Sequence, residues 1–461
     1  MSGRFAGERA VVVGFGSSGR AAASALAREG AIVRVTESRP LEAIASDGPH
    51  PEGVEIMAGG HEPGHLEGAT LVVVSPGVPE RTPVIGWALD RGLPVWSELE
   101  VGVRLCTVPY AAITGTNGKT TTTELVAAAM RASGLDARAC GNVGHPLSTA
   151  ALEPHDALAI ECSSFQLRFT PSLQPRVSVL LNLAPDHLDW HGSLDGYRDA
   201  KARVFRNQTA DDVHVGNLDD EAAAAVSRGA PCEVRWFREG SPSDGEAGFE
   251  GRRVVVRDPD GRTLVDAEPS AKVARPFLID AAAAAAASLA FGIPPEAVRA
   301  ALEGAEAGPH RGTIVVTVGA VRFVDDSKAT NPHATLAALD GRSDVVLIAG
   351  GLAKGVDLTP LAKGARSLRA VIAIGEAAPA LEEVFRLLVP VRRASTMDEA
   401  VAMAFDAAQP AGTVLLAPAC ASQDMFRDYR ERADRFTDAA LALSGTGAHQ
   451  APLPDVRKSH A

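Results

Sequence analysis

Short apolar runs alternate with longer helix-like stretches along the first part of the chain. The runs are rich in valine and isoleucine, which favours β-strands, and they lie at residues 9–13, 32–35, 70–74 and 95–97. Between the first two runs, Gly14-Phe-Gly-Ser-Ser-Gly19 makes a tight turn into a helix that reaches Arg28. Strands that alternate with helices in this way predict a mostly parallel sheet with helices on both faces.

The same alternation continues after Tyr110 and predicts a second α/β unit. Its predicted strands after the first are residues 157–161 and 177–182. Residues 208–270 are less regular and contain a predicted hairpin, 252–256 with 263–266, so we expect a peripheral insertion there. An alanine-rich helix at 277–291 closes the unit, and a linker-like stretch follows it.

A third βα series begins at Thr313. Its predicted strands are residues 322–324, 345–349, 371–374 and 413–417. We therefore expect an α/β protein with an N-terminal Rossmann-like domain, a central P-loop ATPase-like domain with a mostly parallel sheet, and a C-terminal Rossmann-like domain. The expected bounds are 1–98, 99–307 and 308–446, and the Gly-, Pro- and His-rich tail 447–461 is expected to be disordered.

Composition narrows the possible partners. The chain has 461 residues, a formal net charge of -12 and a pI near 5.5, so nothing in its overall charge favours nucleic acid or an anionic membrane. Its five cysteines are scattered without CxxC pairing, which fits reduced thiols in a cytoplasmic protein. We see neither an export leader nor an apolar run long enough to cross a bilayer.

The strongest chemical signal is a phosphate-binding loop at 115–121, Gly-Thr-Asn-Gly-Lys-Thr-Thr, between an apolar run and a helix-like segment. Gly115 and Gly118 let backbone N–H groups point at phosphate oxygens. Lys119 would neutralise the phosphates, and the Thr120 hydroxyl can ligate Mg²⁺. The spacing is two residues shorter than GxxxxGK[ST], but the strand-to-helix context predicts ATP binding.

Further polar residues follow predicted strands, where doubly wound folds bind their ligands. Glu161 ends one such strand, and Asp186-His187 follows the next. With Thr120 they would form a ligand set of oxygen and nitrogen atoms suited to Mg²⁺. Four of the seven lysines, at 119, 201, 328 and 354, fall in or beside these segments and the loops after later strands.

The third series opens with His310-Arg311 and then Asp325-Asp-Ser-Lys-Ala-Thr-Asn331, a dense polar run directly after a strand. Such a run is typical of a loop that contacts a ligand. Lys354 and Ser422 also follow predicted strands and are expected at the corresponding sheet edge.

Taken together, these motifs resemble the Mur ligases of bacterial cell-wall synthesis. The resemblance covers residues 8–440 in order and rests on these segments: Ser75-Pro-Gly77, the loop at 115–121, Gly141-Asn142, Glu161-Cys-Ser-Ser-Phe-Gln166, Asp186-His187, Lys201, His310-Arg311, Asp326-Ser-Lys-Ala-Thr-Asn331 and Ala419-Cys-Ala-Ser422. It implies a monomeric cytoplasmic enzyme of peptidoglycan synthesis, and so of cell shape and division, that adds D-glutamate to UDP-N-acetylmuramoyl-L-alanine through an acyl phosphate.

The resemblance also implies roles for matching residues. ATP would contact Gly115, Thr116, Asn117, Gly118, Lys119, Thr120, Thr121, Arg311 and Asp326. Two Mg²⁺ ions would be held by Thr120, Glu161, His187 and a carbamylated Lys201. The UDP-linked substrate would contact Ser17, Ser18, Glu37, Arg39, Gly77, Asn142, Gln166 and Tyr429. D-Glutamate would contact Lys328, Thr330, Lys354 and Ser422, and the catalytic residues would be Lys119, His187, Lys201 and Lys328.

One segment departs from the family pattern. Mur ligases carry a His-Asn-x-x-Asn stretch, with asparagines near adenine, at the start of the alanine-rich helix, whereas this chain has Pro276-Phe-Leu-Ile-Asp280. Asp280 would retain one polar contact there.

Three other readings stay open from the sequence. Gly14-x-Gly-x-x-Gly19 with Glu37 matches a dinucleotide fingerprint and would suit an NAD-dependent oxidoreductase, although it explains only the first domain. A non-catalytic relative would be expected to lack some of the proposed catalytic and metal-binding side chains. A sister ligase that adds another amino acid, or glutamate to folate, is the remaining enzyme alternative.

Overall fold

The computed structural model describes residues 3–46, 50–142, 144–269, 275–305 and 308–444. The chain divides into two compact units, Met1–Glu306 and Ala307–Ala461, and each is described by itself. The predicted disordered tail 447–461 lies outside the described residues, as does the centre of the predicted linker at 306–307.

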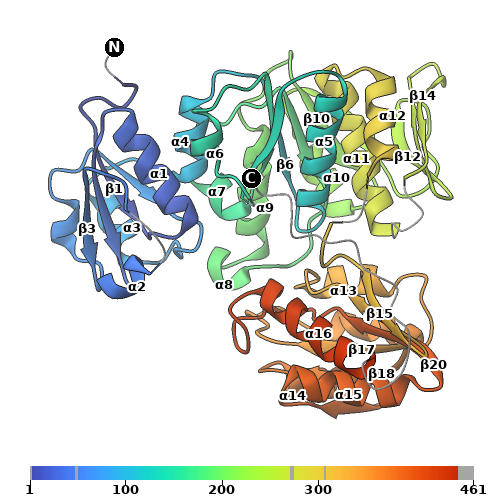
Figure 1. The fold of residues 1–461 in the computed structure, drawn as a ribbon. Coiled ribbons are helices and arrows are strands. Elements are labelled where there is room, and N and C mark those ends of the chain that lie inside the picture. Colours follow the sequence, from blue (N-terminus) through green and yellow to red (C-terminus); the bar gives the residue numbers. More distant parts are fainter. Residues whose placement is uncertain (1–2, 47–49, 143, 270–274, 306–307, 445–461) are drawn as a thin grey trace. The chain divides into compact units, whose positions relative to one another are not determined.

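The first unit begins with a five-stranded parallel sheet in the order β3-β2-β1-β4-β5 (Figure 1). Its strands are β1 (Arg9–Val13), β2 (Ile32–Glu37), β3 (Val54–Ala58), β4 (Leu71–Val74) and β5 (Val95–Ser97), and its helices are α1 (Ser17–Arg28), α2 (Leu41–Ala45), η1 (Pro63–Leu66) and α3 (Pro83–Asp90). The predicted strands are confirmed. Sequence reasoning missed β3, an edge strand that is only partly buried and therefore carries no continuous apolar run.

A second sheet of nine strands follows in the order β14-β13-β12-β11-β10-β9-β6-β8-β7. Its strands are β6 (Tyr110–Thr114), β7 (Ala137–Gly141), β8 (Ala157–Glu161), β9 (Val177–Leu180), β10 (Val213–Asn217), β11 (Glu233–Phe237), β12 (Glu246–Glu250), β13 (Arg253–Arg257) and β14 (Thr263–Ala267). The predicted hairpin is confirmed as the antiparallel pair β13–β14.

The expectation that all of 208–270 is a peripheral insertion is wrong. β10 pairs in parallel with β9, and β11 pairs in parallel with β10, so both strands extend the main sheet. β10 carries a histidine within the core. His214 is fully buried and is hydrogen-bonded to Ser178 and Ser227, which satisfies both ring nitrogens inside the core.

Helices cover both faces of this sheet. They are α4 (Glu98–Leu105), α5 (Lys119–Ala132), α6 (Leu147–Ala150), α7 (Ser164–Arg168), α8 (Leu188–His191), α9 (Leu194–Ala202), η2 (Arg203–Phe205), α10 (Glu221–Ser227), α11 (Arg275–Phe291) and α12 (Pro295–Glu303). The alanine tract of α11 is almost fully buried and packs against α5, as Figure 1 shows. Small side chains let two helix backbones approach closely, which brings α11 next to the phosphate loop.

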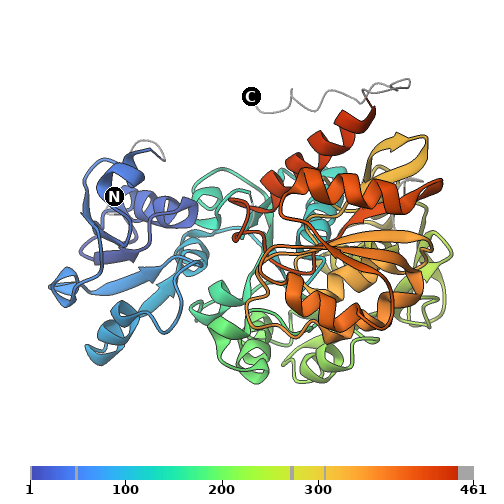
Figure 2. The ribbon, with the colours of Figure 1, turned by 90° about the horizontal axis from the view of Figure 1, so that it is seen from below.

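The second unit is a six-stranded sheet in the order β15-β16-β20-β17-β18-β19, in which only the β15–β16 hairpin is antiparallel. The strands are β15 (Thr313–Val318), β16 (Ala320–Asp325), β17 (Val345–Gly350), β18 (Leu368–Ile374), β19 (Val391–Arg393) and β20 (Ala411–Leu416). The helices are α13 (Pro332–Leu339), η3 (Thr359–Ser367), α14 (Ala378–Phe385), α15 (Met397–Ala408) and α16 (Tyr429–Ser444). Hydrophobic side chains fill a core on each face of the sheet, under α13 and α14 and under α15 and α16 (Figure 2).

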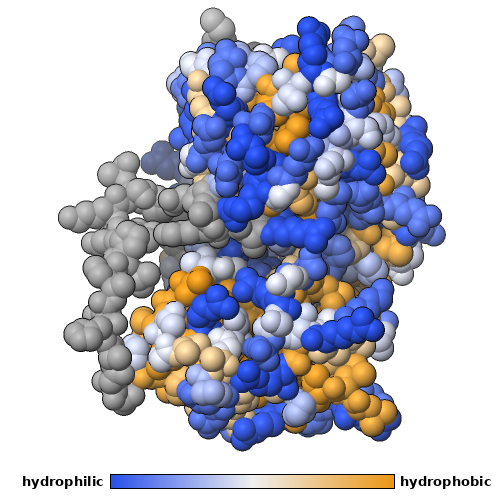
Figure 3. Space-filling view, turned by 90° about the vertical axis from the view of Figure 1, so that its right-hand side faces the viewer, coloured by the Kyte–Doolittle hydropathy of each residue, from blue (hydrophilic) through white to orange (hydrophobic). Residues whose placement is uncertain are grey.

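The surface shows no broad apolar face in the view of Figure 3, where hydrophobic residues form separate patches among hydrophilic ones. The exposed large hydrophobic side chains are spread over both units, as is normal for a water-exposed surface. None of the helices in the described part of the chain combines the length and apolar character that a membrane-spanning segment needs.

A buried arginine joins two loops of the second unit. Arg432, on α16, is fully buried, and its guanidinium donates to Ser327 Oγ at 3.0 Å, to Ser327 O at 2.8 Å and to Cys420 O at 3.0 Å. The acceptors are uncharged, and burial lowers the pKa of Arg432 to about 10. The loops after β16 and β20 are thereby held together.

We expect Arg432→Met to lower the free energy of unfolding by about 2–4 kcal/mol, because it leaves buried carbonyl groups without donors. Urea unfolding of the whole chain measures this. Arg435→Met, which removes an exposed arginine from the same helix, should change stability by less than about 0.5 kcal/mol. Equal effects of the two substitutions would show that the contacts of Arg432 do not stabilise the fold.

Candidate functional site

The predicted phosphate loop lies between β6 and the start of α5. Gly115 and Gly118 both have positive φ, 154° and 86°, and α5 begins at Lys119. The backbone N–H groups of Thr116 and Asn117 donate to Asn182 O and Oδ1 at 3.0 and 2.8 Å. The first turn of α5, including the half-buried Thr120, has the geometry of an anion site at a helix N-terminus.

Two lysines converge on the same carbonyl of this loop. Lys119 Nζ donates to Gly115 O at 3.0 Å and to Thr116 O at 2.9 Å. Lys201, from α9, is 2% exposed, and its Nζ donates to Gly115 O at 2.7 Å and lies 4.8 Å from the Tyr197 ring centroid. Burial, and then repulsion by Lys119, lowers the pKa of Lys201 well below that of an ordinary lysine. Burial therefore disfavours the charged ammonium form at position 201.

Glu161 ends β8 at the same edge of the sheet. Parallel pairing places it opposite Ile113 of β6, one residue before the end of that strand. The residue is 2% exposed, and its Oε1 accepts a hydrogen bond from Asn142 Nδ2 at 2.9 Å. Asn142 follows Gly141, whose φ of 107° and close contact with the Glu161 backbone leave no room for a Cβ. The structure thus pairs two predicted site residues, the carboxylate and the amide.

His187 follows β9 and reaches this edge as well. Its backbone is left-handed, with φ 52°, and its ring lies edge-on to Phe165 at 4.7 Å between centroids. Its Nε2 lies 3.6 Å from Asp186 Oδ2. The loop that carries it is attached to the phosphate loop, since Thr116 Oγ1 hydrogen-bonds Ala184 O at 3.1 Å and the Tyr197 hydroxyl at 2.8 Å.

Asp280 of α11 lies against the phosphate loop. A Cβ at Gly118 would overlap the Asp280 carboxylate, and Thr122 Oγ1 donates to Asp280 O at 3.4 Å. The residue that replaces the family's second asparagine is therefore beside the predicted ATP site.

In the first sheet, the glycine turn carries a pre-formed ion pair. Glu37 Oε2 accepts from Phe15 N at 2.8 Å and from the Arg39 guanidinium at 3.1 Å, and Oε1 accepts from Arg39 N at 3.1 Å. Burial acts to raise the pKa of Glu37, but the hydrogen bonds from Arg39 and Phe15 lower it to about 2. Its carboxylate oxygens are thus engaged by the protein, which does not suit the dinucleotide reading that needs Glu37 for ribose hydroxyls.

The other predicted contacts of the UDP-linked substrate lie in several places. Ser17 and Ser18 open α1, and Gly77 is exposed in the loop after β4. Gln166, by contrast, is fully buried, and its Oε1 accepts from Ser163 N at 3.0 Å and from Ser163 Oγ at 2.9 Å. This is a capping box at the start of α7. The Ser-x-x-Gln spacing carried that signal in the sequence.

In the second unit, the Lys328 side chain contacts Tyr429. Its Nζ donates to the Tyr429 hydroxyl at 3.2 Å and lies 4.5 Å from the ring centroid. Attraction by Lys328 lowers the pKa of Tyr429 against the effect of burial. The structure therefore brings Tyr429, predicted to contact the UDP-linked substrate, to a residue predicted to hold D-glutamate.

The remaining predicted residues of this unit lie on neighbouring loops. Lys354 follows β17, and a β-bridge between Leu352 and Ala421 brings its loop beside the buried Ser422. Thr330 follows Lys328 in the loop after β16.

Arg311 and Asp326 interact electrostatically in the same unit. Burial of the Asp326 carboxyl raises its pKa to about 7, against the opposing attraction of Arg311. The neighbouring His310, with φ 62°, hydrogen-bonds through Nδ1 to Asp325 Oδ2 at 2.7 Å.

Sequence reasoning missed residues that support the site from behind. Asn182 and Tyr197 are hydrogen-bonded to the phosphate loop, and the Tyr197 ring also contacts Lys201. Arg432 holds the loop that contains Ser327. Tyr197 was the residue most open to detection, because it stands four residues before Lys201 and so on the same face of the helix.

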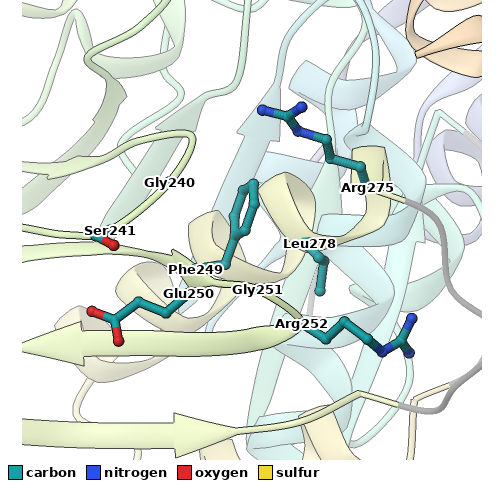
Figure 4. Close-up of a pocket in the computed structure, with 8 residues that line it drawn as sticks. All are labelled: Gly240, Ser241, Phe249, Glu250, Gly251, Arg252, Arg275 and Leu278. Carbon is teal, nitrogen blue, oxygen red and sulfur yellow. The ribbon is translucent and has the colours of Figure 1, made fainter. Parts of the chain in front are cut away.

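Two cavities in the first unit lie near these elements. One, of about 510 Å³, lies between the β12–β13 hairpin and the start of α11; Figure 4 shows Arg275 and Leu278 on the helix and Phe249 on the hairpin. The Arg275 guanidinium is paired with Glu239 at 2.6 Å. The other, of about 610 Å³, is lined by Glu80, Arg168, His191 and part of α9 and η2. None of the predicted site residues lines either cavity.

Comparison with protein families matches three consecutive parts of the chain. Residues 8–97 match the Mur ligase MurD-like N-terminal domain, residues 113–263 the Mur ligase middle domain, and residues 310–420 the Mur ligase glutamate ligase domain.

Curated relatives match nearly the full length. A UDP-N-acetylmuramoylalanine–D-glutamate ligase of Frankia casuarinae is 42% identical over 96% of this chain and 95% of its own. A protein of the same name from Salinibacter ruber is 42% identical over 93% of this chain and 96% of its own.

Solved structures with the same fold are more distant in sequence. UDP-N-acetylmuramate-alanine ligase MurC from Thermotoga maritima is 19% identical, with a TM-score of 0.61 over 94% of this chain and 99% of its own. MurF ligase from the same organism, in complex with ADP, is 16% identical, with a TM-score of 0.61 over 96% of each chain.

The contact between Gly118 and Asp280 predicts that Gly118→Ala abolishes nucleotide binding. An added Cβ must displace the Asp280 carboxylate and distort the first turn of α5, so we expect ATP affinity to fall by about 100-fold or more, as measured by calorimetry with Mg²⁺ and a non-hydrolysable ATP analogue.

Gly134→Ala is the matched control, because Gly134 lies beyond the other end of α5 with a similar φ of 94° and open space around its Cα. It should cost about 1 kcal/mol of stability and leave ATP affinity unchanged. Equal losses of affinity in the two variants would contradict the role assigned to the contact.

Proposed function

The chain belongs to the Mur ligase family, and we propose that it is the ATP-dependent ligase that adds D-glutamate to UDP-N-acetylmuramoyl-L-alanine in peptidoglycan precursor synthesis, giving ADP and phosphate. The observation that carries the proposal is the convergence of Lys119, Lys201 and Glu161 on the edge of one sheet, in a chain that matches glutamate ligases over nearly its whole length.

The chemistry begins with repulsion between two anions. The terminal alanine carboxylate of the substrate attacks the γ-phosphorus of ATP, and ADP leaves with the electron pair of the broken P–O bond. Lys119 would move from the loop carbonyls onto the phosphates, and backbone N–H groups of α5 would hold the transferred phosphoryl group. The product of this step is an acyl phosphate.

The D-glutamate amine then attacks the acyl carbon. A tetrahedral intermediate forms, phosphate leaves, and the amine loses a proton to a nearby base, either His187 or a carboxylate. Lys328, Lys354, Thr330 and Ser422 would receive the amino acid, since two ammonium groups and two hydroxyls complement its two carboxylates. Water must be excluded while the acyl phosphate exists, because water would hydrolyse this intermediate.

Two Mg²⁺ ions are part of the proposal for the first unit. We propose that Thr120 and Glu161 hold one, and that His187 and carbamylated Lys201 hold the other, because oxygen ligands and an imidazole form a set that Mg²⁺ accepts. The ions would reduce the repulsion between the carboxylate and the γ-phosphate. The buried Glu161 carboxylate, which accepts from a neutral amide, retains oxygen lone pairs for such a ligand.

The low pKa of Lys201 supports the carbamate. CO₂ reacts only with the unprotonated amine, and burial beside Lys119 shifts the pKa of Lys201 toward that form. The resulting anion would neutralise part of the positive charge of Lys119. Arginine does not form such a carbamate, so it could not take this role.

The other assignments remain proposals of the same kind. Ser17, Ser18, Glu37, Arg39, Gly77, Asn142, Gln166 and Tyr429 are proposed for the UDP-linked substrate, and Arg311 and Asp326, with residues 115–121, for ATP. Because Gln166 is buried and Tyr429 contacts Lys328, these two would act through their neighbours or after a rearrangement. We also propose the domain bounds 1–98, 99–307 and 308–446, a monomer, and a cytoplasmic location.

The decisive experiment measures phosphate release from Mg-ATP with UDP-N-acetylmuramoyl-L-alanine and one amino acid at a time. Release should require D-glutamate, and mass spectrometry should show the coupled product. Release with L-alanine, L-glutamate or meso-diaminopimelate instead would make the protein a sister ligase. Absence of release with every acceptor would leave a non-catalytic nucleotide-binding protein.

A second test concerns Lys201. Lys201→Met should lower kcat by about 100-fold or more, because it removes the carbamate oxygens proposed to hold the second Mg²⁺. Its melting temperature at pH 7 should not fall. The pKa of Lys201 is lowered in the folded state, so the folded chain holds a proton at this position less readily than the unfolded chain. Burial of the wild-type lysine therefore costs stability until the pH exceeds the unfolded pKa.

The matched control is Lys363→Met, which removes an exposed lysine from the second unit and should change neither quantity. If Lys201→Met kept wild-type kcat, the metal-binding role of Lys201 would be wrong.

A further inference from the structure

Glu98 is a carboxyl group in the core that none of the roles above uses. It is the first residue of α4, directly after the first sheet, and it is completely buried. Its Oε1 accepts from Ser148 N at 2.7 Å, while its Oε2 lacks a hydrogen-bond partner among the described residues. A buried carboxyl with half its acceptors unused is costly, so a purely structural role would not require an acid at this position.

Two other buried polar atoms beside Glu98 also lack partners within the described residues. They are Ser148 Oγ on α6 and Gln166 Nε2 on α7. Burial raises the pKa of Glu98 above its ordinary range, and the side chains of Ser148 and Gln166 act in the opposite direction, which places both beside the carboxyl. A carboxyl acceptor, a hydroxyl and an amide donor are complementary, and a small approach or one bridging water would join all three.

The other end of the Gln166 amide is already committed. Its Oε1 accepts from both Ser163 N and Ser163 Oγ, so Nε2 is the end that faces the core. Ser163 lies two residues after Glu161, whose backbone O in turn accepts from Asn142 N. Hydrogen bonds therefore link Gln166 to the segment that carries Glu161, and the unpartnered Gln166 Nε2 lies beside the Glu98 carboxyl.

We propose that Glu98 is a positioning residue that fixes the amide orientation of Gln166 and through it holds the Glu161–Ser164 turn in the geometry that binds Mg-ATP. This inference rests on the proposed role of Glu161 in the metal site. It also makes Gln166 a support of that turn and gives the α4 segment, which leads out of the first sheet, a direct influence on the metal site.

The residues next to Glu98 already attach α4 to the rest of the first unit, so Glu98 is not needed for that attachment. Ser97 Oγ hydrogen-bonds Thr170 Oγ1 at 2.7 Å, and Glu100 accepts from Ser172 N at 3.0 Å and Ser172 Oγ at 2.6 Å. These contacts already attach α4 to the segment after α7. Glu100 is as buried as Glu98 and lies on the same helix, and its carboxylate accepts from Arg104 and Ser172, so Glu100→Gln is a matched structural control.

The test is Mg²⁺-dependent binding of a non-hydrolysable ATP analogue by calorimetry, without either acceptor substrate. In Glu98→Gln an amide donor faces the Gln166 donor, and we expect the Mg²⁺ concentration for half-maximal binding to rise by about 10-fold, as for other groups that orient metal ligands. Gln166→Glu should have a similar effect. The double variant Glu98→Gln/Gln166→Glu restores one donor facing one acceptor and should recover most of the loss.

Two further variants distinguish an effect on Mg²⁺-dependent binding from a loss of fold stability. Glu100→Gln should lower the melting temperature without changing the Mg²⁺ requirement. Ser148→Ala retains the backbone donor to Glu98 and should fold normally, with an increase in the Mg²⁺ requirement of about 2–5-fold.

An unchanged Mg²⁺ requirement in Glu98→Gln and Ser148→Ala, or a double variant no better than the single ones, would overturn the inference. Because the assay uses no D-glutamate and no UDP-linked substrate, such a result is distinct from a failure of the proposed reaction, which the phosphate-release experiment detects separately.

Discussion

The parallel pairing of β6 with β8 and β9 is the constraint on which the site of the first unit depends. Parallel strands have their carboxyl ends at one edge, and here those ends lead into the phosphate loop, Glu161 and the His187 loop. A helix N-terminus at the same edge supplies backbone N–H groups, and α9 brings Lys201 against them. Without this register, Lys201 and Thr114, which are 87 positions apart, would not meet beside Gly115.

Three ionisable side chains of this protein lie in the core, where burial disfavours their charged forms. Lys201, Glu98 and Arg432 are almost or wholly buried, and burial shifts the pKa of each toward the neutral form. For Arg432, neutral acceptors compensate part of that cost. For Lys201 the shift itself is useful, since it exposes an amine lone pair to modification. Burial thus disfavours the charged forms of the very side chains that have a proposed role in catalysis, in positioning or in the fold.

Strong local patterns made much of the fold predictable. Valine-rich runs at Arg9–Val13 and Val345–Gly350 became central strands, and the glycine-lysine loop became a tight strand-to-helix turn. Prediction failed where burial did not follow the apolar pattern. β3 and β19 are short or partly exposed edge strands, and β10 contains a histidine whose hydrogen bonds form only inside the finished sheet.

The sequence by itself determined which chemical groups are present and, through the order of the motifs, the family to which the chain belongs. Only the tertiary structure decided how these groups face one another: that Lys201 shares a carbonyl with Lys119, that Gln166 turns into the core toward Glu98, and that Tyr429 meets Lys328. The reason is physical. Motif chemistry depends on neighbours in the chain, whereas burial, pKa and side-chain orientation depend on segments that are distant in sequence and are brought together by sheet register and helix packing.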